Sequence, residues 1–237
     1  MHLYYDLLNL YGENGNIKAL KNTLEHLGID VYIKFVTLGE VIDLKNVDLL
    51  YIGMGTISNQ KLALEHICKY KKEIEEYINN NGFVLATGNA MELFGKKINY
   101  LDKPKKALEI FDFEASEINF KIADEVLCKT KFIKNYILGF TNRNSVIKED
   151  IKNPLFEVVK GTGNNLYNKK EGFQFKNFYG TYLIGPILIR NPEFLKYLIK
   201  KLVNSKNKNF KLKKFDLTLE NKAYHEFMNN YYKEYIK

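Results

Sequence analysis

A run of apolar residues at Phe83–Ala86 constrains the fold more than any other part of this sequence. Neither face of the run carries a polar side chain, Gly82 precedes it, and a turn-forming stretch at 87–89 follows it. Strands that are apolar on both faces are typical of the middle of a parallel sheet, because helices cover both sides of such a sheet. The sequence therefore predicts an α/β protein in which this run is a central strand.

The segments before this run alternate between strand patterns and helix patterns. Apolar runs at 3–5, 31–36 and 48–53 predict three further strands. The stretches between them show helical spacing, and Asn16 and Ser58 are the expected N-caps of two helices. An alternating order of strands and helices predicts a mostly parallel, doubly wound sheet with helices on both faces.

The second half of the chain has a different pattern. Residues 108–182 form short aromatic segments with turn signals at 142–144 and 161–165, which predicts extra antiparallel strands added to the sheet. A helix is expected at 193–203, and a last amphipathic helix at about 217–236. We expect one domain over residues 1–205, with a basic linker and C-terminal helix at 206–237 packed on the same domain.

The positive charge of the chain comes almost entirely from lysine. Arg143 and Arg190 are the only arginines among 36 basic residues, and the formal net charge is +8. Arginine is preferred where a protein grips phosphate groups, so we attribute the charge to an AT-rich genome and expect no nucleic-acid partner. The stretch from Lys196 to Lys214 contains eight lysines, its two end residues included, and no acid. This stretch is either a solvated helix face with a linker or a docking patch for an acidic partner.

Other sequence features indicate a cytoplasmic protein without a metal or cofactor. Cys68 and Cys128 are the only cysteines, and they form no cluster with histidine that would suggest zinc. No apolar run is long enough to span a membrane. The first ten residues include Asp6 and lack a basic leader, so they are interpreted as the start of a strand and not as a secretion signal.

The segment from Phe83 to Gly95 has the form of a nucleophile elbow, which is a buried strand, a tight turn and a short helix. In hydrolases such an elbow holds the nucleophile at the tip of the strand, near helix N–H groups that stabilise an oxyanion. Here the elbow position is Gly88, which has no side chain. The neighbouring Thr87 would need an adjacent base to attack a carbonyl, and the sequence offers none nearby.

This elbow resembles that of the CobB/CobQ-like class I glutamine amidotransferases, and of their GatD group in particular. The elbow pattern of that group is a strand followed by Cys-x-Gly-Tyr-Gln-Leu-Leu-Gly. On this chain the cysteine falls at Gly88, the glycine at Ala90 and the glutamine at Glu92. A second family pattern, Gly-Thr-Tyr-Leu-His-Gly-Pro-Leu-Leu, is similar to residues 180–188, with Ile184 in the place of the histidine.

Two further stretches resemble the same group. The family's early pattern around Asn-Leu-Tyr matches residues 9–20 nearly throughout. The glycine-rich loop that supplies an oxyanion donor matches Gly53 to Gly55, with Met54 replacing a glycine. The resemblance therefore covers nearly the whole chain and implies the fold of a class I glutamine amidotransferase.

The resemblance also implies that the catalytic machinery is lost. In the family a cysteine thiolate attacks the glutamine amide and a histidine transfers the proton. No catalytic residue is intact here, because Gly88 is the vestigial nucleophile position and Ile184 is the vestigial base position. We expect these two positions to lie close together and to line a shallow pocket. The expected substrate-binding positions of the vestigial pocket are Gly53, Gly55, Ala90 and Glu92.

By resemblance, the expected partner is a MurT-like protein of the Mur-ligase type. GatD and MurT together amidate the D-glutamate of the lipid II stem peptide, so a lipid-linked substrate would be reached only through the partner. The leading expectation is a glutaminase-inactive GatD-like subunit. Two alternatives remain open: a regulatory module that binds a small molecule in another amidotransferase or ligase complex, and an active glutaminase with relocated catalytic residues.

Overall fold

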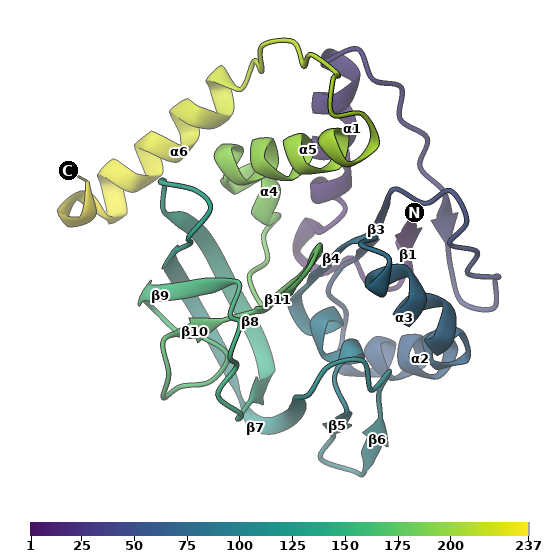
Figure 1. Cartoon of the computed structure of the whole chain (residues 1–237). Coiled ribbons are helices and arrows are strands. Elements are labelled where there is room, and N and C mark those ends of the chain that lie inside the picture. The colour runs from purple at the N-terminus through teal and green to yellow at the C-terminus, as the bar shows by residue number, and fades with distance from the viewer. Residues whose placement is uncertain (237) are drawn as a thin grey trace.

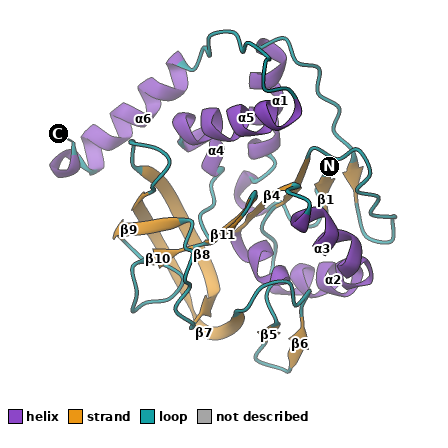
Figure 2. Cartoon of the chain, in the orientation of Figure 1, coloured by secondary structure: helices purple, strands orange, loops and turns teal. Residues whose placement is uncertain are grey.

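Two β-sheets of different character form the framework of the computed structural model, which describes residues 1–236 (Figures 1 and 2). The first sheet has the strand order β11-β12-β4-β3-β1-β2, and only β11 runs antiparallel to its neighbour. The predicted central strand is confirmed, because β4 lies between β3 and β12 and all of its residues are buried. The strands of this sheet are β1 (His2–Leu3), β2 (Phe35–Val36), β3 (Leu49–Ile52), β4 (Phe83–Thr87), β11 (Phe173–Phe175) and β12 (Phe178–Thr181).

Helices cover both faces of the first sheet. On one face α1, α4 and α5 pack against a core that includes Leu85, and on the other face α2 and α3 pack against a core that includes Val84. Since consecutive residues of β4 enter different cores, the sheet is doubly wound, as the sequence predicted. These helices are α1 (Gly15–His26), α2 (Ile57–Ile67), α3 (Lys71–Asn79), α4 (Ile187–Arg190) and α5 (Pro192–Lys206). Short 3-10 helices are η1 (Leu10–Gly12), η2 (Cys68–Tyr70) and η3 (Gly88–Phe94).

Some local predictions for the first half were wrong. Only the last two residues of the predicted strand at 31–36 pair in the sheet, as β2. The side chain of Thr56, not Ser58, caps α2 by accepting a hydrogen bond from the backbone N–H of Asn59 (3.1 Å). Asn16 lies inside α1, where its side chain donates to the Tyr51 hydroxyl (2.9 Å) and accepts from the Leu188 N–H (2.9 Å). Asn16 therefore joins α1 to other parts of the fold and does not cap the helix.

Most strands of the second half form a sheet of their own, while β11 and β12 extend the first sheet. The order of this second sheet is β10-β9-β7-β5-β6, with β8 paired to β7, and only the β5–β7 pair is parallel. The predicted turn at 142–144 is wrong, because these residues lie within β8, whereas the predicted turn at 161–165 does fall in the loop after β9. The strands are β5 (Lys97–Asn99), β6 (Pro104–Lys106), β7 (Glu114–Lys129), β8 (Ile137–Ile147), β9 (Phe156–Lys160) and β10 (Lys170–Glu171).

The C-terminal segment crosses over to the second sheet (Figure 1). Helix α6 (Thr218–Tyr231) is followed by the short 3-10 helix η4 (Lys233–Tyr235), and Tyr224 and Met228 of α6 pack on Leu127 of β7 and Leu138 of β8. The division at residue 205 stays a prediction. No helix within residues 1–236 combines the length and the apolar character that a membrane span requires.

Candidate functional site

The elbow predicted from the sequence is present at the carboxyl end of the central strand. Strand β4 ends at Thr87, and η3 begins at Gly88 with a φ of +61°, in the left-handed region that favours glycine. A sharp strand-to-helix turn of this kind is the geometry that exposes a nucleophile in hydrolases. Here, however, Gly88 and the rest of η3 are buried.

The space in which a nucleophile would stand is filled by Met54. A Cβ atom added at Gly88 would lie 2.5 Å from the Cβ of Met54 and 2.7 Å from its Cγ. Real Cβ atoms do not approach other heavy atoms so closely, so a side chain at this position requires Met54 to move. The backbone of Met54 is fixed as well, because its carbonyl oxygen accepts a hydrogen bond from the Leu10 N–H (2.9 Å).

The glycine-rich loop around Met54 is held against the elbow by Asn89. The Gly55 N–H donates to Oδ1 of Asn89 (3.1 Å), and Nδ2 of Asn89 donates to the Gly55 carbonyl oxygen (3.0 Å). The N–H of Gly55 is therefore already satisfied and is not free to stabilise an oxyanion. Gly53 is closely packed too, since a Cβ there would lie 2.5 Å from the carbonyl oxygen of Leu8.

The second motif meets the elbow through a buried carboxylate, Glu13. The Thr87 hydroxyl and the Gly185 N–H (3.1 Å) both donate to this carboxylate, and the Tyr51 hydroxyl lies 3.3 Å from it. Thr87 directly precedes Gly88, and Gly185 directly follows Ile184. Strand β12 also lies beside β4, with Thr181 opposite Thr87. The structure thus brings together the chain neighbours of the two positions that were expected to lie close.

Buried side chains lie where the two motifs meet. The side chain of Ile184 is fully buried, its N–H donates to the Phe140 carbonyl oxygen (2.8 Å), and Glu13 is fully buried beside it. The expected shallow pocket lined by Gly88 and Ile184 stays a prediction, and in the structure Met54 packs where a side chain at Gly88 would stand. Glu13 was not among the residues expected at the site, although it is the only acid between Asp6 and Glu25 and stands inside a family pattern.

Ala90 and Glu92 also lie in the interior. The Glu92 carboxylate accepts hydrogen bonds from Nε2 of Gln60 (2.7 Å), the Tyr182 hydroxyl (3.0 Å) and the Ser145 hydroxyl. Burial raises the pKa of Glu92, and these hydrogen bonds oppose the rise. Ala90 is fully buried within η3. A substrate-binding role for these positions stays a proposal, and their present contacts are all internal.

An arginine completes the polar network around Glu92. The guanidinium of Arg143 lies 3.8 Å from the centre of the Tyr182 ring and donates to the Ser145 carbonyl oxygen (2.8 Å). A second buried carboxylate, Glu171, accepts from the Thr181 hydroxyl (2.8 Å) and the Tyr182 N–H (2.7 Å). Burial raises the pKa of Glu171 to about 7, while Arg143 opposes that rise. The network therefore joins η3 and β12 of the first sheet to β8 of the second.

Neither cysteine is prepared for nucleophilic attack. Cys128 is fully buried in β7, and burial raises the pKa of its thiol well above the ordinary value. Burial also raises the pKa of Cys68, which is partly exposed at η2. A catalytic cysteine needs the opposite shift, because the thiolate is the nucleophile. Within residues 1–236, no three His, Cys, Asp or Glu side chains are grouped so that they could hold a metal ion.

Glu13→Gln is expected to flatten the dependence of stability on pH. Burial raises the pKa of Glu13 to about 7 in the folded protein, against about 4.3 for an ordinary glutamate. Between these values the folded state binds more protons than the unfolded state, so the free energy of unfolding falls as pH rises through this window. The fall due to Glu13 is on the order of 3 kcal/mol and should disappear in the variant.

Urea unfolding at pH values from 4.5 to 8 measures this effect. Glu76→Gln, at an exposed position of α3, is the matched control and should retain the wild-type profile. Glu171→Gln should flatten the profile in the same direction as Glu13→Gln, since burial also raises the pKa of Glu171 to about 7. A Glu13→Gln profile as steep as that of the wild type would show that Glu13 does not carry the buried proton.

Comparison with protein families gives a match over most of the chain. A family model described as the CobB/CobQ-like glutamine amidotransferase domain matches residues 1–192. Among curated proteins, the GatD subunit of lipid II isoglutaminyl synthase (glutamine-hydrolyzing) from Streptococcus pneumoniae is 31% identical over 210 residues, covering 86% of this chain and 80% of that protein. The subunit of the same name from Staphylococcus aureus is 32% identical over 223 residues, covering 94% and 91%.

Solved structures show the same fold at lower identity. The structure of PurLQS from Thermotoga maritima superposes with a TM-score of 0.57 at 14% identity, covering 87% of this chain and 97% of that chain. A crystal structure of a glutamine amidotransferase superposes with a TM-score of 0.54 at 15% identity, covering 85% and 98%. The resemblance and the α/β fold predicted from the sequence are thereby confirmed.

Proposed function

Because this chain belongs to the CobB/CobQ-like glutamine amidotransferase family, we propose that it is a GatD-like subunit of a complex that amidates lipid II, and that it does not hydrolyse glutamine itself. The observation that carries the second half of this proposal is the packing of Met54 against Gly88, which fills the site of the nucleophile. The first half rests on the two GatD relatives, both described as subunits of lipid II isoglutaminyl synthase.

The nucleophile and the proton carrier of the glutaminase reaction are missing from this chain, and one oxyanion donor is already bonded. Amide hydrolysis through a covalent intermediate needs a nucleophile, a proton carrier and an oxyanion hole. Gly88 supplies no nucleophile, Ile184 supplies no proton carrier, and the Gly55 N–H is bonded to Asn89. Residues of a catalytic unit act together, and their loss costs roughly 10⁴ to 10⁶ in kcat. Glutamine turnover by this chain should therefore be at background.

A subunit without glutaminase activity still needs a partner to take part in amidation. We propose a MurT-like protein of the Mur-ligase type, which would activate the carboxylate of the D-glutamate in the stem peptide. Ammonia would then come from solution or from another subunit. In this arrangement the chain would act by binding its partner, and the lipid-linked substrate would touch only the partner.

Reconstitution with a Mur-ligase-type partner tests both halves of the proposal. We expect the two proteins to co-elute in size-exclusion chromatography at micromolar concentrations. We also expect the complex to amidate a lipid II analogue when ammonium is supplied and not when glutamine is the only nitrogen source. The GatD relative from Streptococcus pneumoniae, described as glutamine-hydrolyzing, is the positive control for glutamine-driven amidation.

The separate outcomes distinguish the competing functions. Glutamine-driven amidation, or stoichiometric labelling of the chain by a diazo-ketone analogue of glutamine, would mean that the catalytic residues have been relocated. Separate elution of the two proteins would remove the proposed partnership and leave a regulatory module of another complex as the better hypothesis.

A further inference from the structure

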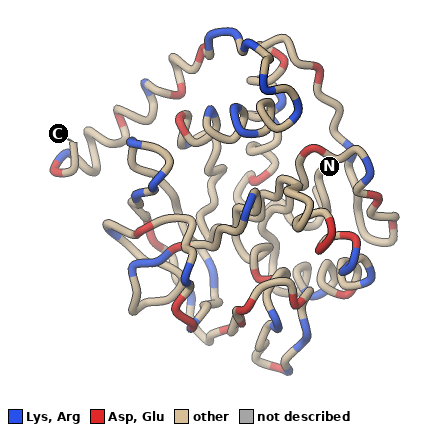
Figure 3. Tube along the Cα trace, in the orientation of Figure 1, with Lys and Arg blue, Asp and Glu red and all other residues tan. Residues whose placement is uncertain are grey.

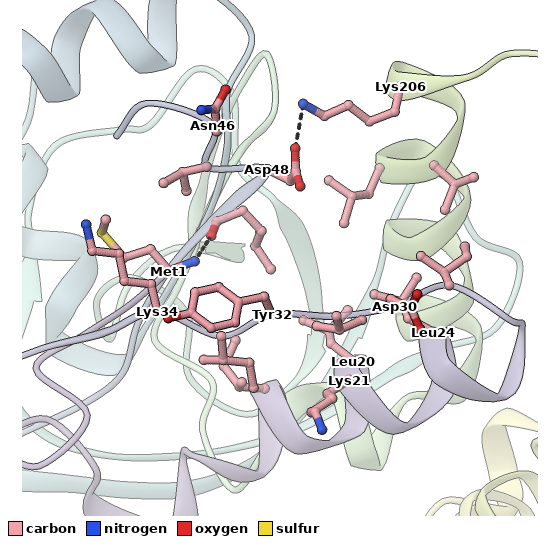
Figure 4. A pocket seen from close by; sticks show the side chains of 18 of the residues that line it. Met1, Leu20, Lys21, Leu24, Asp30, Tyr32, Lys34, Asn46, Asp48 and Lys206 are labelled. Atoms are coloured by element: carbon pink, nitrogen blue, oxygen red, sulfur yellow. Dashed lines mark hydrogen bonds and ion pairs between the residues drawn. The ribbon is translucent and has the colours of Figure 1, made fainter. Parts of the chain in front are cut away.

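A groove of about 510 Å³ lies at the opposite end of the first sheet from Gly88. It is formed at the amino ends of the strands, between α1, the end of α5 and the extended segment 29–34 (Figure 4). Gly88 stands at the carboxyl end of β4, so the groove and the vestigial catalytic positions are separate places. The volume is in the range of about 300 to 1,000 Å³ that is typical of ligand pockets.

The groove lies beside segment 29–34, which forms no strand and bonds to the sheet only at its end, where the Lys34 carbonyl oxygen accepts from the His2 N–H (2.8 Å). Its alternate residues Ile29, Val31 and Ile33 point toward the core under α1 and α5 but are only partly buried. Leu202 of α5 and Phe210 of the following loop line the groove as well, and Phe210 is 38% exposed. Apolar surface is thus left open within a concave site, and covering it would be favourable.

The charges around the groove favour an anion. Lys206 is paired with Asp48 (2.5 Å), and Lys21 is paired with Glu25 (3.0 Å). Within residues 1–236, Lys34 and Lys45 line the groove without an ion-pair partner. The remaining acid of the lining is Asp30, and Figure 4 places it at the far end of the extended segment from Lys34, beyond Tyr32.

The surface beside the groove also carries positive charge. Lysines lie along α5 and the loop that follows it, beside the groove (Figure 3). One of them, Lys213, reaches to the end of α1, where its Nζ would lie 3.3 Å from a Cβ at Gly28. A positive field around an apolar groove attracts ligands that carry a negative head group and an apolar body.

We propose that this groove binds an anionic amphiphile. The ligand class is a molecule with an extended apolar body, which lies against Val31, Ile33 and Leu202, and one carboxylate, sulfonate or phosphate group, which is held by Lys34 and Lys45. This binding site does not depend on the proposed role in amidation, because none of its residues belongs to the elbow or to the second motif.

A tryptophan reporter at the rim of the groove tests the proposal directly. The chain has no tryptophan, and Tyr32 is 90% exposed, so Tyr32→Trp gives a single fluorescent reporter without disturbing the core. We expect laurate, titrated below its micelle concentration, to change the fluorescence along a saturable curve for one site. Dodecyl trimethylammonium, which has a similar chain and the opposite charge, should give no saturable change.

Two charge-reversal pairs locate the head group. Lys34→Glu with Lys45→Glu, made in the reporter background, should raise the Kd for laurate at least about tenfold, since two attractive charges become repulsive. Lys131→Glu with Lys148→Glu changes the net charge equally at exposed positions outside the groove and should leave the Kd unchanged. Calorimetry of laurate binding to the wild-type chain checks that one molecule binds.

Four results would overturn the proposal. The absence of a saturable response to laurate would exclude the site. An equal response to the cationic amphiphile, or an equal loss in both lysine pairs, would exclude the assigned head-group contacts. A reporter that responds to a Mur-ligase-type partner and not to laurate would show that the groove is a protein interface.

Discussion

Gly88→Cys alone is expected to leave the protein without glutaminase activity and to lower its free energy of unfolding by about 1–3 kcal/mol, the usual cost of overpacking. The new Cβ would collide with the side chain of Met54 at 2.5 Å. The φ of +61° adds strain, because residues other than glycine rarely adopt it. Catalysis would fail in any case, since the added thiol would have Ile184 and not a histidine near it. Urea unfolding and glutamate release measure the two effects.

A second substitution separates steric conflict from the loss of catalytic groups. Met54→Gly, which removes the Cβ, Cγ and Sδ atoms that a Cβ at Gly88 would meet, should make Gly88→Cys less costly, so that the double variant is more stable than the sum of the single effects predicts. Adding Ile184→His to this pair should allow labelling by a diazo-ketone analogue of glutamine but should keep turnover at least about 10²-fold below that of an intact relative. Efficient turnover by Gly88→Cys alone would mean that Met54 moves freely.

The central strand and its elbow could be predicted because their signals are local. An apolar run at Phe83–Ala86 between two turn-forming stretches can be buried on both faces only in the middle of a parallel sheet. The strand predicted at 31–36 failed for the opposite reason. Its β-rich composition fits a strand, but pairing depends on which segments lie alongside, and residues 29–34 lie at the groove.

For the candidate site, too, some features could be predicted from the sequence and others could not. The positions Gly88 and Ile184 could be found through long patterns that stand far apart in the sequence. The packing of Met54 and Glu13 beside them could not be predicted, because it depends on contacts with residues distant in the chain. A methionine within a glycine-rich loop was a visible departure, but only the packing shows that its side chain points at the elbow.

The segment around Arg143 is a strand, although its local sequence favours a turn. Asn142 and Asn144 flank this arginine and favour a turn, yet the segment is a strand, and Arg143 is only 2% exposed. The guanidinium donates to the Ser145 and Gly163 carbonyl oxygens and to the Thr141 hydroxyl (3.2 Å). These hydrogen bonds satisfy the donors of the buried guanidinium. Local residue preferences do not predict them, because Gly163 is distant in the chain.

Arg143→Met is therefore expected to destabilise the protein by about 3–5 kcal/mol, the range for removing one partner of a buried charged network. Methionine has a suitable length and preserves much of the packing on Tyr182, so the loss would come mainly from polar groups left without a partner. The carboxylates of Glu92 and Glu171 would lose the nearby cation that lowers their pKa values. Chemical unfolding at pH 7 measures the expected loss.

The pH dependence of this loss distinguishes an electrostatic role from simple packing. Without Arg143 the folded-state pKa values of Glu92 and Glu171 would rise further above the unfolded value of about 4.3. Stability would then go on falling to a higher pH, because the folded state would hold its protons longer. We expect the difference in the free energy of unfolding between Arg143→Met and wild type to be larger at pH 8 than at pH 5.

Arg190→Met is the control, because it removes an arginine from an ion pair at the surface. It should lower the free energy of unfolding by less than about 1 kcal/mol. A constant difference for Arg143→Met at both pH values would mean that Arg143 acts through packing and neutral hydrogen bonds, and that it does not affect the protonation of the two carboxyl groups.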